Sequence, residues 1–161
     1  IIQLSEDDAN FHNMGTTLTF IVVVGGKLYI GGIGDSRVYR LRGDALDQQT
    51  TDHSLTQALV DAGTISAVDA ETHRYRNVLY RYLGTKEGST GTEPTQILPK
   101  EGDRYLLCSD GLSNLVTADE LRDLLVEKSF QETARELIDL ANARGGDDNI
   151  TAILARVDSV A

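Results

Sequence analysis

The chain has 161 residues, 40% of them hydrophobic and 25% charged, which is typical of one globular domain with a buried core. It carries 15 basic and 25 acidic residues, a formal net charge of -10. This excess disfavours nucleic acid and anionic membranes as partners and suits divalent cations wherever carboxylates converge. The single cysteine, Cys108, excludes an internal disulfide, predicts a buried inert thiol and favours a reducing, cytoplasmic location. Neither a membrane span nor a signal peptide is expected.

The first part of the chain predicts antiparallel strands. Residues 1–13 indicate the end of a helix and its exit loop. β-branched residues over 16–24 predict a strand, and the Gly-Gly pair after it predicts a hairpin turn into a strand over 27–33. Further strands are predicted over 36–42 and 45–50. Because the four strands have short connections, they favour an antiparallel meander.

The remaining elements mix helices with strands. Helical spacing over 54–62 ends at Gly63, and a polar excursion follows. Capping boxes predict helices that start after Thr117 and Ser129. The other predictions are a short helix near 66–72, strands over 78–83, 95–98, 104–109 and 150–157, and a loop over 84–92. Strands early and helices late indicate an α+β fold, in one domain over 1–161.

Four polar motifs lie where predicted strands or helices begin or end: Gly32-Ile33-Gly34-Asp35-Ser36-Arg37, Asp52-His53-Ser54-Leu55, Ser109-Asp110-Gly111-Leu112 and Gly146-Asp147-Asp148-Asn149. Each also has a structural interpretation. For the first, taken alone, a hairpin turn is favoured, and the last is compatible with a solvated turn. In the second, a helix cap by Asp52 or Ser54 is favoured over a catalytic His53. In the third, a helix cap by Ser109 and a functional Asp110 stay open. Their shared position at strand ends favours a site.

The residue types at these motifs point to a hard cation. Carboxylates from several strand ends provide the oxygen ligands that Mg²⁺ or Mn²⁺ prefers. The lone cysteine and the spacing of His12, His53 and His73 do not form a zinc motif. The sequence also has no Walker loop and no nucleophile elbow. A metal-activated water is therefore the best available nucleophile, and two cations about 3.5–4 Å apart are usual in phosphate-ester hydrolysis.

Six ordered motifs closely resemble the bacterial branch of the metal-dependent serine/threonine protein phosphatases, the phosphatase-2C family. They are Met14-Gly15-Thr16-Thr17, Gly34 to Tyr39, Asp52-His53-Ser54-Leu55, Asn77 to Gly84, Ser109 to Leu112 and Gly146 to Thr151. The resemblance implies an α-β-β-α sandwich of two antiparallel sheets with a dinuclear Mn²⁺ or Mg²⁺ centre. It implies Asp110 and Asp148 as metal ligands, and Asp35 as a ligand of a third, looser ion. Arg37 is assigned no catalytic role.

The resemblance also implies a function. Metal-activated water would hydrolyse phosphoserine or phosphothreonine on protein substrates, and a cognate serine/threonine kinase is a further expected partner. The excursion over 58–77 corresponds to the flap, a variable segment beside the active site that is linked to substrate choice.

The chain departs from the family pattern at its beginning. Members start with strands that carry an Arg-x-x-Asn-Glu-Asp-like motif and an Asp-Gly-x-Gly-Gly motif, which supplies the aspartate that bridges the core metals. Neither motif occurs here, so the expectation is a domain without its N-terminal strands. These would come from upstream of Ile1 or from another chain. The alternative is a phosphatase-like regulatory or binding module without catalysis. The presence of Asp35, Asp110 and Asp148 favours the enzyme.

Overall fold

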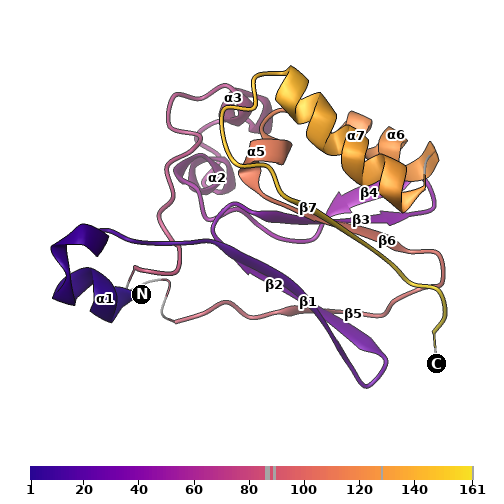
Figure 1. Cartoon of the computed structure of the whole chain (residues 1–161), viewed down its shortest axis with the longest axis horizontal. Helices are drawn as coiled ribbons and strands as arrows, with labels where there is room; N and C mark the ends of the chain where they lie inside the picture. Colours follow the sequence, from indigo (N-terminus) through magenta and orange to yellow (C-terminus); the bar gives the residue numbers. More distant parts are fainter. Residues whose placement is uncertain (86–87, 89, 128, 161) are drawn as a thin grey trace.

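The computed structural model describes residues 1–85, 88, 90–127 and 129–160. Two antiparallel sheets and several helices make up the chain (Figure 1). The elements are α1 (Ile2–Asp7), the 3₁₀ turn η1 (Ala9–Phe11), β1 (Leu18–Val24), β2 (Lys27–Ile33), β3 (Arg37–Arg42), β4 (Ala45–Gln48), α2 (Leu55–Asp61), α3 (Ala67–Glu71), β5 (Thr95–Ile97), β6 (Arg104–Cys108), α5 (Asp110–Ser113), α6 (Ala118–Glu127), α7 (Phe130–Ala143) and β7 (Ala152–Arg156).

The sheets stack face to face, and helices cover one outer face. One sheet has the order β1-β2-β5 and the other β4-β3-β6-β7. A first core fills the space between them, with Ile30, Val38 and Tyr105 at its centre. A second core joins the four-stranded sheet to α6 and α7 through residues such as Leu106 and Leu137. This arrangement confirms the predicted α+β fold with two antiparallel sheets.

Local sequence signals located most elements correctly. The hairpin between β1 and β2 turns at Gly25 and Gly26, whose φ angles of 56° and 74° suit glycine. Ser66 and Ser129 close capping boxes at the starts of α3 and α7. Thr117 and Glu120 exchange the same kind of hydrogen bonds before α6.

Two strand predictions were wrong. The first four strands do not form one meander, because β2 pairs with β1 and β5 while β3 pairs with β4 and β6. The chain leaves one sheet and enters the other between β2 and β3. Residues 78–83 form no continuous strand; Leu79 and Leu83 make only isolated bridges, with Ser54 and Thr16. The predicted loop over 84–92 lies partly outside the described residues.

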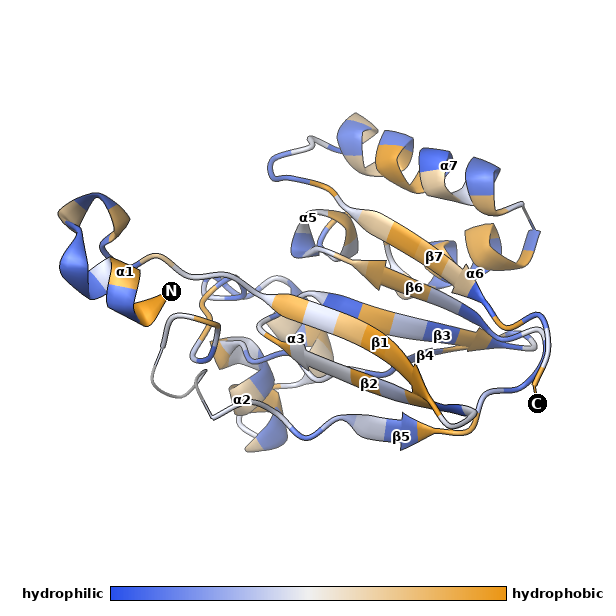
Figure 2. Ribbon diagram, turned by 60° about the horizontal axis from the view of Figure 1, so that its bottom comes forward, coloured by the Kyte–Doolittle hydropathy of each residue, from blue (hydrophilic) through white to orange (hydrophobic). Residues whose placement is uncertain are grey.

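The end of β1 that leads into the hairpin is apolar and exposed. Val22, Val23 and Val24 are 46%, 69% and 56% exposed, and hydrophobic residues colour this strand in Figure 2. Helix α1 lies apart from both sheets, beyond the start of β1 (Figures 1 and 2). No described helix is both long and apolar enough to cross a membrane.

Candidate metal centre

Three predicted site aspartates lie at one edge of the four-stranded sheet, and this edge is the one formed by the ends of its strands, not by an outer strand. In the register of the sheet, Arg37 of β3 pairs with Cys108 of β6, and Cys108 pairs with Ala152 of β7. Asp35 comes just before β3, Asp110 just after β6, and Asp148 just before β7. Because these three strands are antiparallel neighbours, the start of β3, the end of β6 and the start of β7 meet at the same edge.

The motifs around Asp110 and Asp148 pack directly against one another. The Ser109 hydroxyl donates to the carbonyl of Asn149 and accepts from the amide of Thr151, both at 3.0 Å. A Cβ atom on Gly111 would lie 2.5 Å from the same Asn149 carbonyl oxygen, so only glycine allows this approach. Ser109 occupies the N-cap position of α5, but its side chain makes no cap hydrogen bond. It joins the two motifs instead.

A tight turn holds Asp35 in place. Gly34 has a φ of 102°, and a Cβ there would lie 2.3 Å from Cγ2 of Thr17. His53 binds both polar groups of Gly34: its amide donates to the Gly34 carbonyl at 2.9 Å, and its Nδ1 accepts from the Gly34 amide at 3.2 Å. Burial, followed by the charge of Arg81, lowers the pKa of His53, which keeps Nδ1 available as an acceptor. His53 therefore has a structural role.

The carboxylates disfavour one another's ionisation. Burial and then the negative charge of Asp110 raise the pKa of Asp35 from 3.8 to about 6. Burial and then the charge of Asp148 raise the pKa of Asp110, whereas Arg37 acts in the opposite direction. A bound cation would relieve this repulsion, because it favours the ionised form of each neighbouring carboxylate.

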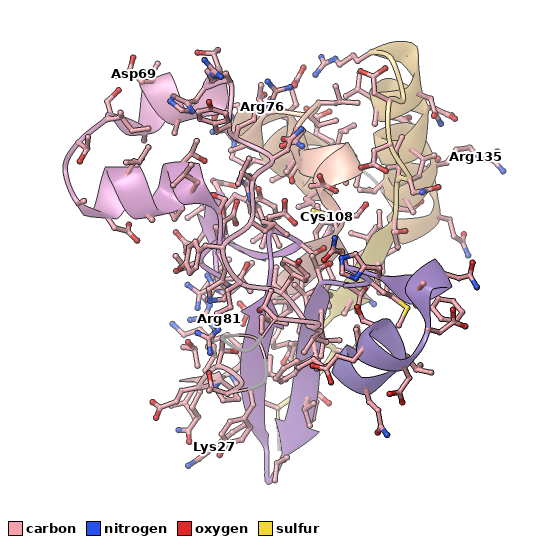
Figure 3. All side chains as sticks on the ribbon, turned by 90° about the vertical axis from the view of Figure 1, so that its left-hand side faces the viewer. Lys27, Asp69, Arg76, Arg81, Cys108 and Arg135 are labelled. Atoms are coloured by element: carbon pink, nitrogen blue, oxygen red, sulfur yellow. The ribbon has the colours of Figure 1, made fainter. Side chains whose placement is uncertain are left out.

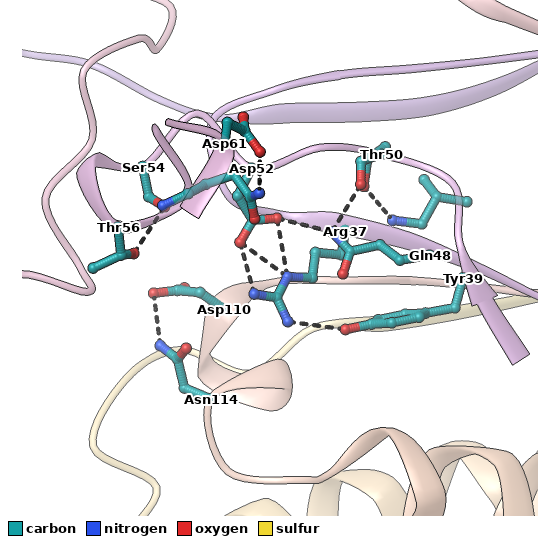
Figure 4. Close-up of polar contacts among 12 residues, drawn as sticks. Arg37, Tyr39, Gln48, Thr50, Asp52, Ser54, Thr56, Asp61, Asp110 and Asn114 are labelled. Atoms are coloured by element: carbon teal, nitrogen blue, oxygen red, sulfur yellow. Dashed lines mark hydrogen bonds and ion pairs between the residues drawn. The ribbon is translucent and has the colours of Figure 1, made fainter. Parts of the chain in front are cut away.

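Arg37 and Asp52 form an ion pair at the base of the site (Figure 4). The Nε of Arg37 donates to both carboxylate oxygens at 3.0 Å, and Nη2 donates to Oδ2 at 2.7 Å. Gln48 donates to Oδ1 of Asp52, and Arg37 also donates to the hydroxyl of Tyr39. Burial lowers the pKa of Arg37, but its bonds to Asp52 outweigh that effect and raise it.

The structure also shows which residue of the motif Asp52-His53-Ser54-Leu55 caps the following helix. Ser54 caps α2 by accepting from the amide of Gln57 at 3.2 Å. Asp52 does not cap the helix, because both of its oxygens bind Arg37.

A cleft of about 510 Å³ opens above these residues. Its lining includes Asp35, Arg37, Asp52 and Asp110 on the sheet side, and Arg76 on the segment that contains α2 and α3. Figure 3 shows Arg76 beside α3, on the side that faces the end of β6 at Cys108. The segment predicted as the flap therefore forms the opposite wall of the cleft. Cys108 itself is buried, as predicted, and burial raises the pKa of its thiol to about 12, which disfavours the reactive thiolate.

The chemistry of the donors fits a hard divalent cation in part. Carboxylate oxygens are the right ligands for Mn²⁺ or Mg²⁺. Across the described residues, however, no group of three or more His, Cys, Asp or Glu side chains is close enough to hold a metal ion together. The fold brings the three aspartates to one edge without assembling a complete ligand set from them.

Comparisons with known proteins agree with this architecture. The sequence pattern of the protein phosphatase 2C family matches residues 2–155. The serine/threonine phosphatase Stp of Listeria welshimeri is 40% identical over 155 residues, which cover 96% of this chain and 61% of the relative. The crystal structure of the Mycobacterium tuberculosis serine/threonine phosphatase PstP/Ppp matches with a TM-score of 0.85 and 40% identity, over 98% of this chain and 66% of that one.

A second PstP structure, the catalytic domain in complex with two manganese ions, matches with a TM-score of 0.80 and 39% identity. The match covers 96% of this chain and 63% of the PstP chain. The two-sheet sandwich thus has the fold of these phosphatases. The chain belongs to the protein phosphatase 2C family. It spans about six tenths of the length of the curated Listeria relatives that it matches.

Two residues of the site were missed from the sequence. Arg37 was given no task although it stands two positions after Asp35, and its ion pair with Asp52 forms only in the folded chain. Gly111 was noted only as part of a motif, and its close packing on Asn149 depends on the pairing of β6 with β7. The closeness of Arg37 to Asp35 in the sequence was the one signal that could have drawn attention to it.

Proposed function

We propose that residues 1–161 form one phosphatase-2C catalytic unit that hydrolyses phosphoserine and phosphothreonine in proteins. Asp110 and Asp148 would hold Mn²⁺ or Mg²⁺, and Asp35 would help to hold a further ion. The observation that carries the proposal is the convergence of these aspartates, from the ends of three neighbouring strands, in a chain of this family. The manganese-bound PstP structure supports the choice of metal.

The residues of this chain have distinct tasks in the proposal. The contact between Ser109 and Asn149 holds Asp110 beside Asp148, and the contact between Gly34 and His53 holds Asp35. When bound, the metal ions would stabilise charge on the phosphoryl oxygens and make water nucleophilic at neutral pH. Since three carboxylates do not complete such a centre, we propose that water molecules fill the remaining coordination positions.

The surroundings of the site suggest its partners. The flap over 58–77 forms one wall of the cleft and would contact the phosphorylated protein segment. We also propose a cytoplasmic location and a cognate serine/threonine kinase that supplies phosphorylated substrates. Both are proposals by analogy with the family.

A non-catalytic regulatory or binding module is the second candidate. The observation in its favour is that no group of three metal-ligand side chains forms among the described residues. Hydrolysis by this chain would exclude it.

The test is Mn²⁺-dependent release of phosphate from a phosphothreonine peptide. The chain is expected to hydrolyse the peptide, and Asp110→Asn and Asp148→Asn are expected to lower the rate at least about 100-fold. Even a substitution of a residue that only hydrogen-bonds a metal ligand lowers metal affinity or activity about 10–100-fold. Asp44→Asn, in the turn at the far end of β3, is the matched control and should keep full activity. A folded chain that shows no Mn²⁺-dependent hydrolysis would contradict the proposal.

A further inference from the structure

Arg37 places a fixed positive charge in a site that otherwise gathers negative charge. It lines the same cleft as Asp35 and Asp110, and Figure 4 shows its guanidinium beside Asp110 and below Asp52. The side chain is 27% exposed, whereas that of Asp52 is 8% exposed. The ion pair is therefore buried on its Asp52 side and open on its cleft side.

The guanidinium is anchored by only part of its donors. Nε and one N–H of Nη2 bind Asp52, and one N–H of Nη1 binds the Tyr39 hydroxyl at 3.0 Å. A guanidinium has five N–H groups. Two of them, one on each terminal nitrogen, have no acceptor among the described residues. The three anchoring donors fix the plane in which these two point.

We propose that these two N–H groups of Arg37 receive phosphoryl oxygens, so that Arg37 is an anion-binding residue of the cleft. The inference rests on the proposed function, because it places the phosphoryl group of the substrate in this cleft. Guanidinium donors match the spacing of phosphoryl oxygens, and such charge-assisted hydrogen bonds are about twice as strong as neutral ones. A guanidinium that is already held in position loses little entropy when the anion binds.

The other cation of the cleft lining is less suited to this task. Among the described residues that line the cleft, the basic ones are Arg37 and Arg76. Arg76 is exposed on the flap, so its long side chain would have to be ordered at an entropic cost. A dianion that approaches Asp35 and Asp110 also needs compensating positive charge close to them, and Arg37 lies nearest in sequence and in the sheet.

The experiment measures binding of inorganic phosphate to the whole chain by calorimetry, at saturating Mn²⁺, together with the affinity for Mn²⁺ itself. Arg37→Gln is expected to weaken phosphate binding by about tenfold or more, because it removes charge-assisted hydrogen bonds to the anion. Its affinity for Mn²⁺ is expected to stay the same or rise, because a positive charge beside Asp110 is removed. A site that had merely collapsed would lose affinity for both ions.

The chain offers a matched control on the same strand. Arg42, at the other end of β3, binds buried Asp103 through Nε and Nη2 just as Arg37 binds Asp52. Arg42→Gln should lower stability without changing phosphate affinity. Because Arg37→Gln leaves Asp52 unpaired, the double variant Arg37→Gln/Asp52→Asn is measured as well and should show the same loss of phosphate binding. Asp52→Asn alone should retain phosphate binding.

The outcomes separate this inference from the proposed function. Unchanged phosphate affinity in both Arg37 variants, or a loss in Arg76→Gln instead, would overturn the role of Arg37 while hydrolysis by the wild-type chain still stands. Phosphate binding that depends on Arg37, in a chain without hydrolysis, would support the inference and contradict the function. A wild-type chain that binds no phosphate would overturn the inference.

Discussion

Strand β3 carries an arginine at each end, and each arginine binds a buried aspartate. Arg37 binds Asp52 at the cleft, and Arg42 binds Asp103 at the opposite end of the sheet. The first pair lines a cleft together with Asp35 and Asp110. The second pair joins β3 to the turn before β6, since Asp103 also accepts from the amide of Lys100 at 2.8 Å. The same pair of residue types thus serves a site at one end and the framework at the other.

Asp103→Asn is expected to destabilise the chain by about 2–3 kcal/mol, because Arg42 loses the charge of a partner that is only 1% exposed. Burial alone would raise the pKa of Asp103, but hydrogen bonds from Arg42 and Lys100 outweigh it and hold the pKa below 3.8. A carboxylate whose pKa is lowered by folding stabilises the fold at pH values above its ordinary pKa. This stabilisation is lost as the pH falls through the lowered pKa. Urea unfolding between pH 6 and pH 3 should therefore show the difference between wild type and variant shrinking below about pH 4. A difference that is constant over this range would contradict the pairing.

Some residues of the site could be predicted from the sequence, whereas the partner of Arg37 could not. The motifs of Asp35, Asp110 and Asp148 drew attention because they lie where strands begin or end, which is a local property. Their role as metal ligands was implied by the family resemblance. The partner of Arg37 was not predictable, because Asp52 follows β4 and reaches Arg37 only when β3 and β4 have paired.

At the scale of elements, locally encoded features were predicted and paired ones were not. The capping boxes at Thr117 and Ser129 are complete within four residues, so their helices were located from the sequence. Residues 78–83 look like a strand by composition, but a strand needs a continuous partner. Here Leu79 and Leu83 meet two different segments of the chain.

The contact between α5 and the segment before β7 gives a prediction at this scale. Gly111→Ala would place a Cβ 2.5 Å from the Asn149 carbonyl oxygen and push Asp110 away from Asp148. We expect at least about tenfold weaker Mn²⁺ binding, measured by calorimetry, together with lower stability. Gly43→Ala is the control: its φ of 59° makes alanine strained, but nothing lies within 4 Å of the new Cβ. It should lower stability alone. Equal Mn²⁺ affinity in both variants would contradict the role of the Gly111–Asn149 contact in cation binding.

For the whole molecule, the concentration of carboxylates at one sheet edge links stability to cations. An ion that binds the folded chain only, at about 100 times its dissociation constant, adds about 2.7 kcal/mol of stability. For a chain of 161 residues this corresponds to a rise of about 5–10 °C in Tm. Thermal unfolding with excess Mn²⁺ should show this rise, and a chelator should reverse it. Asp110→Asn should remove most of it, and an unchanged Tm in the wild type would contradict cation binding.

The junction of Ser109 and Gly111 with Asn149 also governs when the acidic edge can form. Asp110 begins α5, and α6 and α7 lie between it and Asp148, so the two aspartates meet only when β7 pairs with β6. Such a contact between distant segments forms late, because the intervening chain must first be ordered. During synthesis, β7 leaves the ribosome after β6, because it follows β6 in the chain. Affinity for a cation at this edge therefore cannot precede the pairing of β7 with β6, so an immature chain acquires it only when this strand docks.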